Sequence, residues 1–237
     1  MDLLAIFAVL ISFFIKGLAG FANTLIFGAI MNFSAANLQI TPLSTLLSTP
    51  SNLIIVWKER KNVSVKTFLY LTAMVMAGSI PGTFFLKSAD TGLLKSLFGV
   101  LIIIVGVEML LRERARKKSG SKLLMTVIGL VSGICCGMFG VGALLAAYVS
   151  RTSDDPGQFR GTLCAVFAAE NCFRLVLYAC TGILTGDILM QAAVLLPFEF
   201  VGLAAGIFCS GKLKERTVKR AVIVLLIISG IALIFNA

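Results

Sequence analysis

Two apolar segments of this chain are each too long for one straight membrane crossing, and both are interrupted by glycine. Residues 3–33 carry glycines at 17, 20 and 28, and residues 122–150 carry them at 129, 133, 137, 140 and 142. In hydrocarbon an unpaired backbone N–H or C=O is costly, so a broken helix survives only where protein buries it or where it lines an aqueous cavity. Interrupted segments at corresponding places in two halves of a chain indicate a transporter built from repeats, with its binding site at the breaks.

The remaining apolar sequence settles the fold class. With 58% hydrophobic and 14% charged residues, a chain of 237 residues could not bury its apolar surface in one soluble core. Further apolar segments near the ~20 residues that span a bilayer lie at 40–57, 67–86, 92–111, 159–182, 187–209 and 218–235. We therefore predict an all-α polytopic membrane protein whose single integral domain lies in the lipid bilayer.

The distribution of basic residues predicts how the segments cross. The net charge of +10 comes from short clusters between apolar runs, which is typical of cytoplasmic loops and argues against nucleic-acid binding. If all eight segments cross, the two faces carry similar numbers of basic residues. If segment 122–150 instead enters and leaves on one face, 17 of the 21 basic residues share that face, in clusters at 58–66, 112–122, 151–160 and 212–220. We expect a re-entrant segment and a multi-pass protein of the cell membrane, the inner membrane in a prokaryote.

Glycines in the second half of the sequence repeat the spacing of glycines in the first half. Gly78, Gly82 and Gly106 recur as Gly202, Gly206 and Gly230, each 124 positions later. We predict two repeats, residues 1–118 and 119–237, each a re-entrant glycine-rich hairpin followed by three transmembrane helices. Three crossings per half invert the second repeat relative to the first, so the hairpin tips meet near the midplane and both termini lie outside.

Two further expectations concern the length of the hairpin arms and the contacts of the paired glycines. Arms of about 12 residues reach about 18 Å, the middle of a ~30 Å core. The small-xxx-small pairs are expected to be helix contacts inside one chain, with the seam of a homodimer as the alternative.

At this point the chain resembles the sulfite exporter TauE/SafE family, also called the toluene sulfonate uptake permease family. The resemblance rests on the openings GLAGFANTLIFG and GLVSGICCGMFGVG, the polar second segments, the basic loop at 112–122 and the length. It implies a secondary transporter of a small sulfur-containing or organic anion such as sulfite or a sulfonate. The family pattern has a denser glycine cluster at each opening, whereas Ala22, Asn23 and Thr24 stand in the first one here.

The physics of helix ends also favours an anion. A half-helix that begins near the midplane presents unpaired N–H groups and the positive end of its dipole. We expect restarts around 21–24 and 138–140, although the glycines could serve only tight packing. The predicted substrate-binding residues are Lys16, Gly20, Asn23, Thr24, Ser48, Asn52, Gly137, Gly140, Asn171 and Arg174.

Ionisable residues inside membrane segments are functional candidates by default. Glu170 and Arg174 are four residues apart on a helix, so they form either a self-neutralising pair or part of the site. Lys16 has no carboxylate close in sequence, so we expect it either to attract the substrate, which we favour, or to pair with a group distant in sequence. Glu170 and Glu199 are candidates for coupling to a proton or sodium gradient.

Two other classes of function remain as alternatives. A passive anion channel would share the polar path, and a membrane thiol-redox enzyme would use Cys135 and Cys136. These cysteines are adjacent and lack the C-x-x-C spacing of thiol-disulfide enzymes. All six cysteines lie in apolar segments, and the chain has no histidine. We therefore expect free thiols, no metal or other cofactor, and no enzymatic activity.

Overall fold

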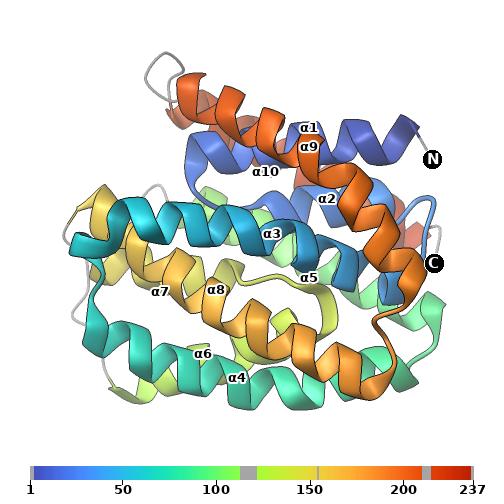
Figure 1. The fold of residues 1–237 in the computed structure, drawn as a ribbon, viewed down its shortest axis with the longest axis horizontal. Coiled ribbons are helices and arrows are strands. Elements are labelled where there is room, and N and C mark those ends of the chain that lie inside the picture. The colour runs from blue at the N-terminus through green and yellow to red at the C-terminus, as the bar shows by residue number, and fades with distance from the viewer. Residues whose placement is uncertain (1–2, 113–121, 154, 210–214, 236–237) are drawn as a thin grey trace.

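The computed structural model describes residues 3–112, 122–153, 155–209 and 215–235, and the regular structure in these ranges is helical (Figure 1). The helices are α1 (Leu3–Ala19), α2 (Asn23–Met31), α3 (Asn37–Glu59), a 3₁₀ turn η1 (Arg60–Asn62), α4 (Val65–Ser88), α5 (Thr91–Arg112), α6 (Lys122–Phe139), α7 (Ala143–Thr152), α8 (Pro156–Thr181), α9 (Gly186–Cys209) and α10 (Glu215–Phe235). Most of the basic loop at 112–122 and part of the cluster at 212–220 lie outside the described residues.

Five of these helices are long and apolar enough to cross a membrane, namely α4, α5, α6, α8 and α9. The expected all-α class with several membrane-spanning segments is therefore confirmed for the described residues. Helix α3 is long enough but carries many hydroxyl and amide side chains, most of them buried.

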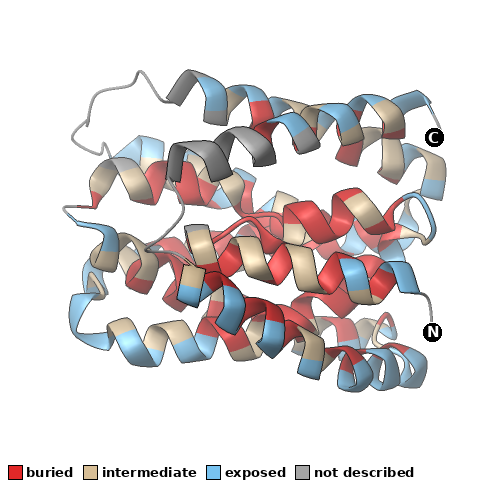
Figure 2. Cartoon of the chain, turned by 90° about the horizontal axis from the view of Figure 1, so that it is seen from above, coloured by how far each residue is buried: buried red, intermediate tan, exposed pale blue. Residues whose placement is uncertain are grey.

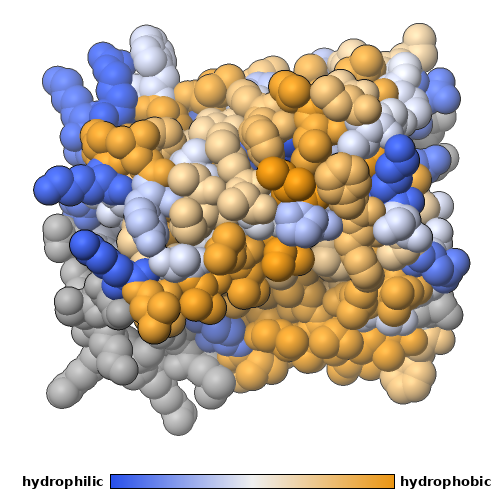
Figure 3. All heavy atoms as spheres, turned by 90° about the horizontal axis from the view of Figure 1, so that it is seen from below, coloured by the Kyte–Doolittle hydropathy of each residue, from blue (hydrophilic) through white to orange (hydrophobic). Residues whose placement is uncertain are grey.

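The surface and the interior have the polarity of a membrane protein. Figure 2 shows burial concentrated at the middle of the bundle, and Figure 3 shows a belt of apolar side chains between two polar ends. Large apolar side chains such as Leu69, Phe84, Val201 and Phe208 are exposed, whereas Lys16, Glu170, Arg174 and Glu199 are buried. An apolar exterior around a polar interior is stable only where lipid replaces water at the belt.

Both glycine-rich segments are broken helices. The chain leaves α1 at Ala19 and restarts at Asn23, with Gly20 and Ala22 in left-handed conformations at φ 81° and 77°. It leaves α6 at Phe139 and restarts at Ala143, with Gly140 at φ 71°. The first restart lies where the sequence predicts it, whereas the second comes later than 138–140.

The arms of these broken segments are unequal, which corrects the expected length of about 12 residues. The first arms have 17 and 18 residues and the returning arms have 9 and 10. The physical reason is that Gly129, Gly133 and Gly137 continue the helix α6. A glycine inside a helix keeps its backbone hydrogen bonds, so its presence alone does not mark a break.

The glycines inside helices serve close packing between the two halves of the chain. A Cβ added to Gly133 of α6 would lie 2.8 Å from the Cα of Gly78 in α4. A Cβ added to Gly206 of α9 would lie 2.9 Å from the Cα of Gly17 in α1. The paired glycines are thus helix contacts inside one chain, and this packing leaves no room for a second chain at these positions.

Replacing Gly206 with Val should destabilise the protein, because the new side chain would push α9 away from α1. Overpacking of this kind costs about 1–3 kcal/mol or more. Thermal unfolding of the purified protein in detergent would measure it. The matched control is Gly186→Val in the same helix, where an added Cβ meets nothing within 4 Å. Equal losses in both variants would contradict this role of Gly206.

Candidate functional site

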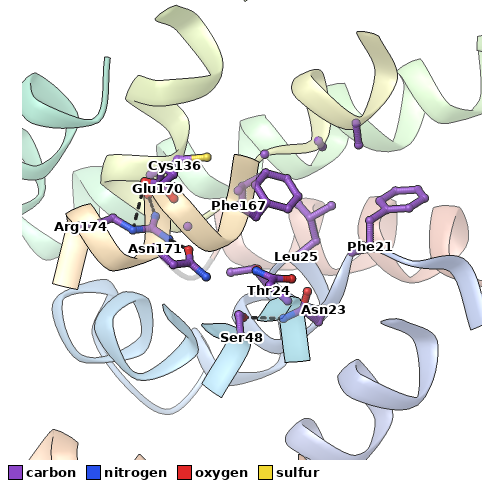
Figure 4. Close-up of a pocket in the computed structure, with 17 residues that line it drawn as sticks. Phe21, Asn23, Thr24, Leu25, Ser48, Cys136, Phe167, Glu170, Asn171 and Arg174 are labelled. Atoms are coloured by element: carbon purple, nitrogen blue, oxygen red, sulfur yellow. Dashed lines mark hydrogen bonds and ion pairs between the residues drawn. The ribbon is translucent and has the colours of Figure 1, made fainter. Parts of the chain in front are cut away.

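The two helix breaks border the same cavity (Figure 4). Its lining comes from the first break and the start of α2, from the second break and the start of α7, and from α3, α6 and α8. The lining residues are Phe21–Leu25, Ser48, Asn52, Cys136, Gly140–Ala143, Ala146, Phe167, Glu170, Asn171 and Arg174. The cavity volume is about 30 Å³. At 10–15 Å³ for each water, it has room for about two ordered waters.

Two helix N-termini open into this cavity without a cap. The cap residues are Ala22 for α2 and Gly142 for α7, and neither makes a side-chain hydrogen bond to its helix. The first backbone donors within these turns are Ile26, which donates to Ala22 O, and Ala146, which donates to Gly142 O. The N–H groups of residues 23–25 and 143–145 therefore have no hydrogen-bond partner in the described chain. Such groups, together with the positive ends of two dipoles, are suited to bind an anion.

Lys16 of α1 lies behind this cavity and is bonded to α3. Its Nζ donates to Asn52 Oδ1 at 2.7 Å, to Ser51 Oγ at 2.8 Å and to the backbone oxygen of Ser48 at 3.5 Å. Glu199 of α9 interacts electrostatically with this ammonium group. Neither carboxylate oxygen of Glu199 has a hydrogen bond of normal geometry in the described residues. Lys16 and Glu199 are therefore buried ionisable side chains that interact electrostatically on the side of α3 away from the cavity, without an ion pair at contact distance between these two described residues.

Arg174 of α8 occupies the other side of the cavity. Its Nε lies 3.3 Å from Glu170 Oε1, its Nη2 donates to Asn171 Oδ1 at 2.8 Å, and its Nη1 donates to the backbone oxygen of Cys136. Tyr178 donates to the next carbonyl, Gly137 O, at 3.2 Å. These side chains cap the last turn of α6, where the dipole is negative, so Arg174 is a structural cation as well as a lining residue. The self-neutralising pair of Glu170 and Arg174 is present.

Most of the sequence-predicted site residues come together here. Those that line the cavity are Asn23, Thr24, Ser48, Asn52, Gly140, Glu170, Asn171 and Arg174. Asn23 uses its amide nitrogen to donate to Ser48 Oγ at 2.7 Å. One of the two N–H groups of this amide, which the sequence assigned to the anion, is therefore already engaged.

The remaining predicted residues lie around the cavity and not in its wall. Lys16 and Glu199 are behind α3, and Gly20 lies in the first break, where an added Cβ would meet Arg160. Gly137 is inside α6, where an added Cβ would lie 2.8 Å from the backbone nitrogen of Thr83 in α4. Gly137 therefore packs two helices together, because the break begins only at Gly140.

Sequence reasoning missed an aromatic wall of the cavity. Phe167 of α8 lies against Gly142, and Phe21 packs edge-on against Phe159 with ring centroids 6.1 Å apart. Phe167 precedes Glu170 and Asn171 by three and four residues, so the helical period places all three on one face. That spacing was the signal that could have found it. Cys136 also lines the cavity, and Cys135 is a partly exposed free thiol.

An apolar belt around a buried polar cavity, with two uncapped helix ends beside it, defines a polytopic membrane protein with an internal polar cavity. The family model described as "Sulfite exporter TauE/SafE" matches residues 4–233, and the chain belongs to this family.

One curated relative is the "Probable sulfite/organosulfonate exporter TauE" of Cupriavidus necator, 27% identical over 154 residues. The alignment covers 65% of this chain and 60% of that protein, so the chain matches less than two thirds of its relative's length. No solved structure matches the chain.

Gly140→Ala should destabilise the protein more than Gly182→Ala. Both glycines have positive φ, at 71° and 72°, so the backbone strain of an alanine is the same for both. Only at Gly140 would the Cβ meet a neighbour, 2.9 Å from Thr24 Cγ2, and a β-branched side chain cannot easily turn away. We expect a difference of about 1 kcal/mol or more in the free energy of unfolding. Equal effects in thermal unfolding would show that the two breaks do not touch across the cavity.

Proposed function

We propose that this protein is a secondary transporter that moves a small sulfur-containing or organic oxyanion, such as sulfite or a sulfonate, across the cell membrane. The observation that carries the proposal is the convergence of two uncapped helix N-termini on one buried cavity. Backbone N–H groups from both sides can bind the oxygens of one anion. The family and the name of the relative from Cupriavidus necator support the class of substrate.

We further propose that the chain is an inverted repeat with two re-entrant hairpins, α1–α2 and α6–α7. The packing glycines support this architecture, because helices at corresponding positions in the two halves make corresponding contacts. Gly78 and Gly82 of α4 receive α6, and Gly202 and Gly206 of α9 receive α1. Each half thus holds the first hairpin arm of the other half. In addition, α1 begins and α10 ends at the same end of the molecule, as both hairpins require (Figure 1).

Cysteine labelling in cells tests this topology. In a background in which the six native cysteines are replaced by alanine, Lys122→Cys and Pro156→Cys flank the second hairpin at exposed positions. Both should react only with a reagent that reaches the cytoplasm, whereas Asp90→Cys should react from outside. Labelling of positions 122 and 156 from opposite sides would refute the re-entrant hairpin.

The size of the cavity favours a carrier over a channel. With a volume of about 30 Å³ and a lining of mostly buried residues, it has room for about two ordered waters in this conformation. A substrate can enter only if the surrounding helices or side chains move, which is how alternating access operates. The thiol-redox alternative finds no support in the family or in the adjacent positions of Cys135 and Cys136.

Coupling to a proton gradient is assigned to Glu199 in this proposal. Its carboxylate is buried and has no hydrogen bond of normal geometry in the described chain, and intramembrane carboxylates of this kind serve as proton carriers. Glu170 is less suited, since Arg174 already lies 3.3 Å from it.

Transport of sulfite and methanesulfonate into proteoliposomes, with and without a pH gradient, tests the function. Wild-type protein should accumulate at least one of these anions when a gradient is applied. Glu199→Gln should bind the anion but lose most of the stimulation by the gradient, whereas Asp187→Asn, an exposed carboxylate on the same helix, should behave as wild type. Equilibration without accumulation would indicate a channel, and an unchanged response in Glu199→Gln would remove this residue from coupling.

A further inference from the structure

Two buried asparagines face the cavity from neighbouring helices in equivalent settings. Asn52 of α3 is 2% exposed and Asn171 of α8 is 4% exposed, and α3 packs against α8. Each accepts a hydrogen bond on Oδ1 from a buried cation, Lys16 at 2.7 Å and Arg174 at 2.8 Å. The two cations come from different elements, α1 and α8, and yet they make the same contact.

This contact fixes which end of each amide points into the cavity. Ammonium and guanidinium groups donate hydrogen bonds and cannot accept them, so the amide oxygen must face the cation. Turning the amide over would place its N–H₂ group against the cation and lose a charge-assisted hydrogen bond. Because the two cations can only donate hydrogen bonds, they determine the orientation of both amides.

The amide nitrogens that remain have no partner. Neither Asn52 Nδ2 nor Asn171 Nδ2 donates a hydrogen bond to any part of the chain that the structure describes, although both side chains are buried and line the cavity. Figure 4 shows the amide nitrogen of Asn171 directed away from Arg174 into the space before Ser48 and Thr24. Buried donors normally find an acceptor, so these two are suited to a ligand that brings its own oxygens.

The cations themselves are occupied by the protein. Lys16 uses its three donors on Asn52, Ser51 and the Ser48 carbonyl and does not line the cavity. Arg174 is engaged by Glu170, Asn171 and Cys136. Lys16 is therefore not free to bind a substrate directly, which departs from the role that the sequence suggested for it, and the contacts of Arg174 hold its guanidinium group against α6 and α8.

We propose that Lys16 and Arg174 are positioning residues that hold the oxygens of Asn52 and Asn171, so that both amide N–H₂ groups face a bound oxyanion. This inference rests on the proposed function, since it needs an oxyanion in the cavity. It deepens that function by naming the recognition elements: two neutral amides beside the free N–H groups of α2 and α7. An anion held by neutral donors is released without breaking a buried ion pair, which suits a carrier.

A double-mutant cycle on the Lys16 side tests the inference, because replacing Arg174 would also uncap α6. The dissociation constants of methanesulfonate and sulfite would be measured with wild type, Asn52→Ala, Lys16→Met and the double variant. Each single change should weaken binding about tenfold or more, because one donor to a charged ligand is lost or misdirected. The double variant should bind no more than about twofold worse than Asn52→Ala, since Lys16 acts through Asn52. Losses that multiply would mean direct contact by Lys16 and would overturn the proposal.

Three further variants separate the effects of these changes on binding from effects on folding. Lys16→Met leaves Glu199 without its cation, so the cycle is repeated with Glu199→Gln, and the same coupling is expected. Asn52→Asp keeps the side-chain volume and the bond from Lys16 but removes the amide donor, so it should fold and should bind at least about tenfold more weakly. Lys16→Arg, which can still donate to Asn52, should restore binding.

The outcomes distinguish a failure of the positioning role from a failure of the proposed function. Normal binding by Asn52→Asp, or loss of binding in a folded Lys16→Arg, would refute the positioning role alone. A wild-type protein that binds neither methanesulfonate nor sulfite would refute the proposed function and with it this inference.

Discussion

The structure depends on one constraint, that lipid offers no hydrogen bonds to a polypeptide backbone. A helix forms its backbone hydrogen bonds within itself and can therefore face lipid, whereas the chain is broken at 20–22 and 140–142, where most residues are buried by the surrounding helices. Backbone N–H groups left over at such breaks must face an acceptor in the protein, a cavity, or a ligand. Here they face one cavity, so the same constraint that confines the breaks to the interior also creates the site.

The exchange of helix contacts between the halves gives the breaks their precise placement. Helix α6 lies on α4 and α1 lies on α9, and glycine at both seams lets the backbones approach closely. The long arm of each broken segment is thereby fixed by the other half of the chain. The short arms α2 and α7 then begin at defined points on either side of the cavity. Arg174 and Tyr178 strengthen this arrangement by capping the end of α6.

The sequence was sufficient for the features that depend on composition and local pattern. Apolar run lengths predicted the all-α membrane class, and polar residues within those runs, such as Asn52 and Asn171, pointed to residues that line one cavity. What it could not supply depends on three-dimensional packing. Gly137 and Gly140 have similar neighbours in the sequence. The structure shows that Gly137 continues α6 and packs against α4, whereas the helix ends before Gly140. Likewise, nothing near Lys16 in sequence reveals that Asn52, 36 positions later, accepts a hydrogen bond from it.

Ala22 makes the two helix breaks energetically unequal. Its φ of 77° lies in a region that costs an L-residue with a Cβ roughly 1–2 kcal/mol, whereas Gly142, the corresponding cap residue of α7, has a φ of −108°. The contacts around the first break therefore hold Ala22 in a conformation that costs backbone energy, and the second break does not carry this cost. A conformational change that released Ala22 from this φ would lower the backbone energy of the first break and leave that of the second unchanged. The two breaks would then contribute unequally to any equilibrium between conformations of the protein.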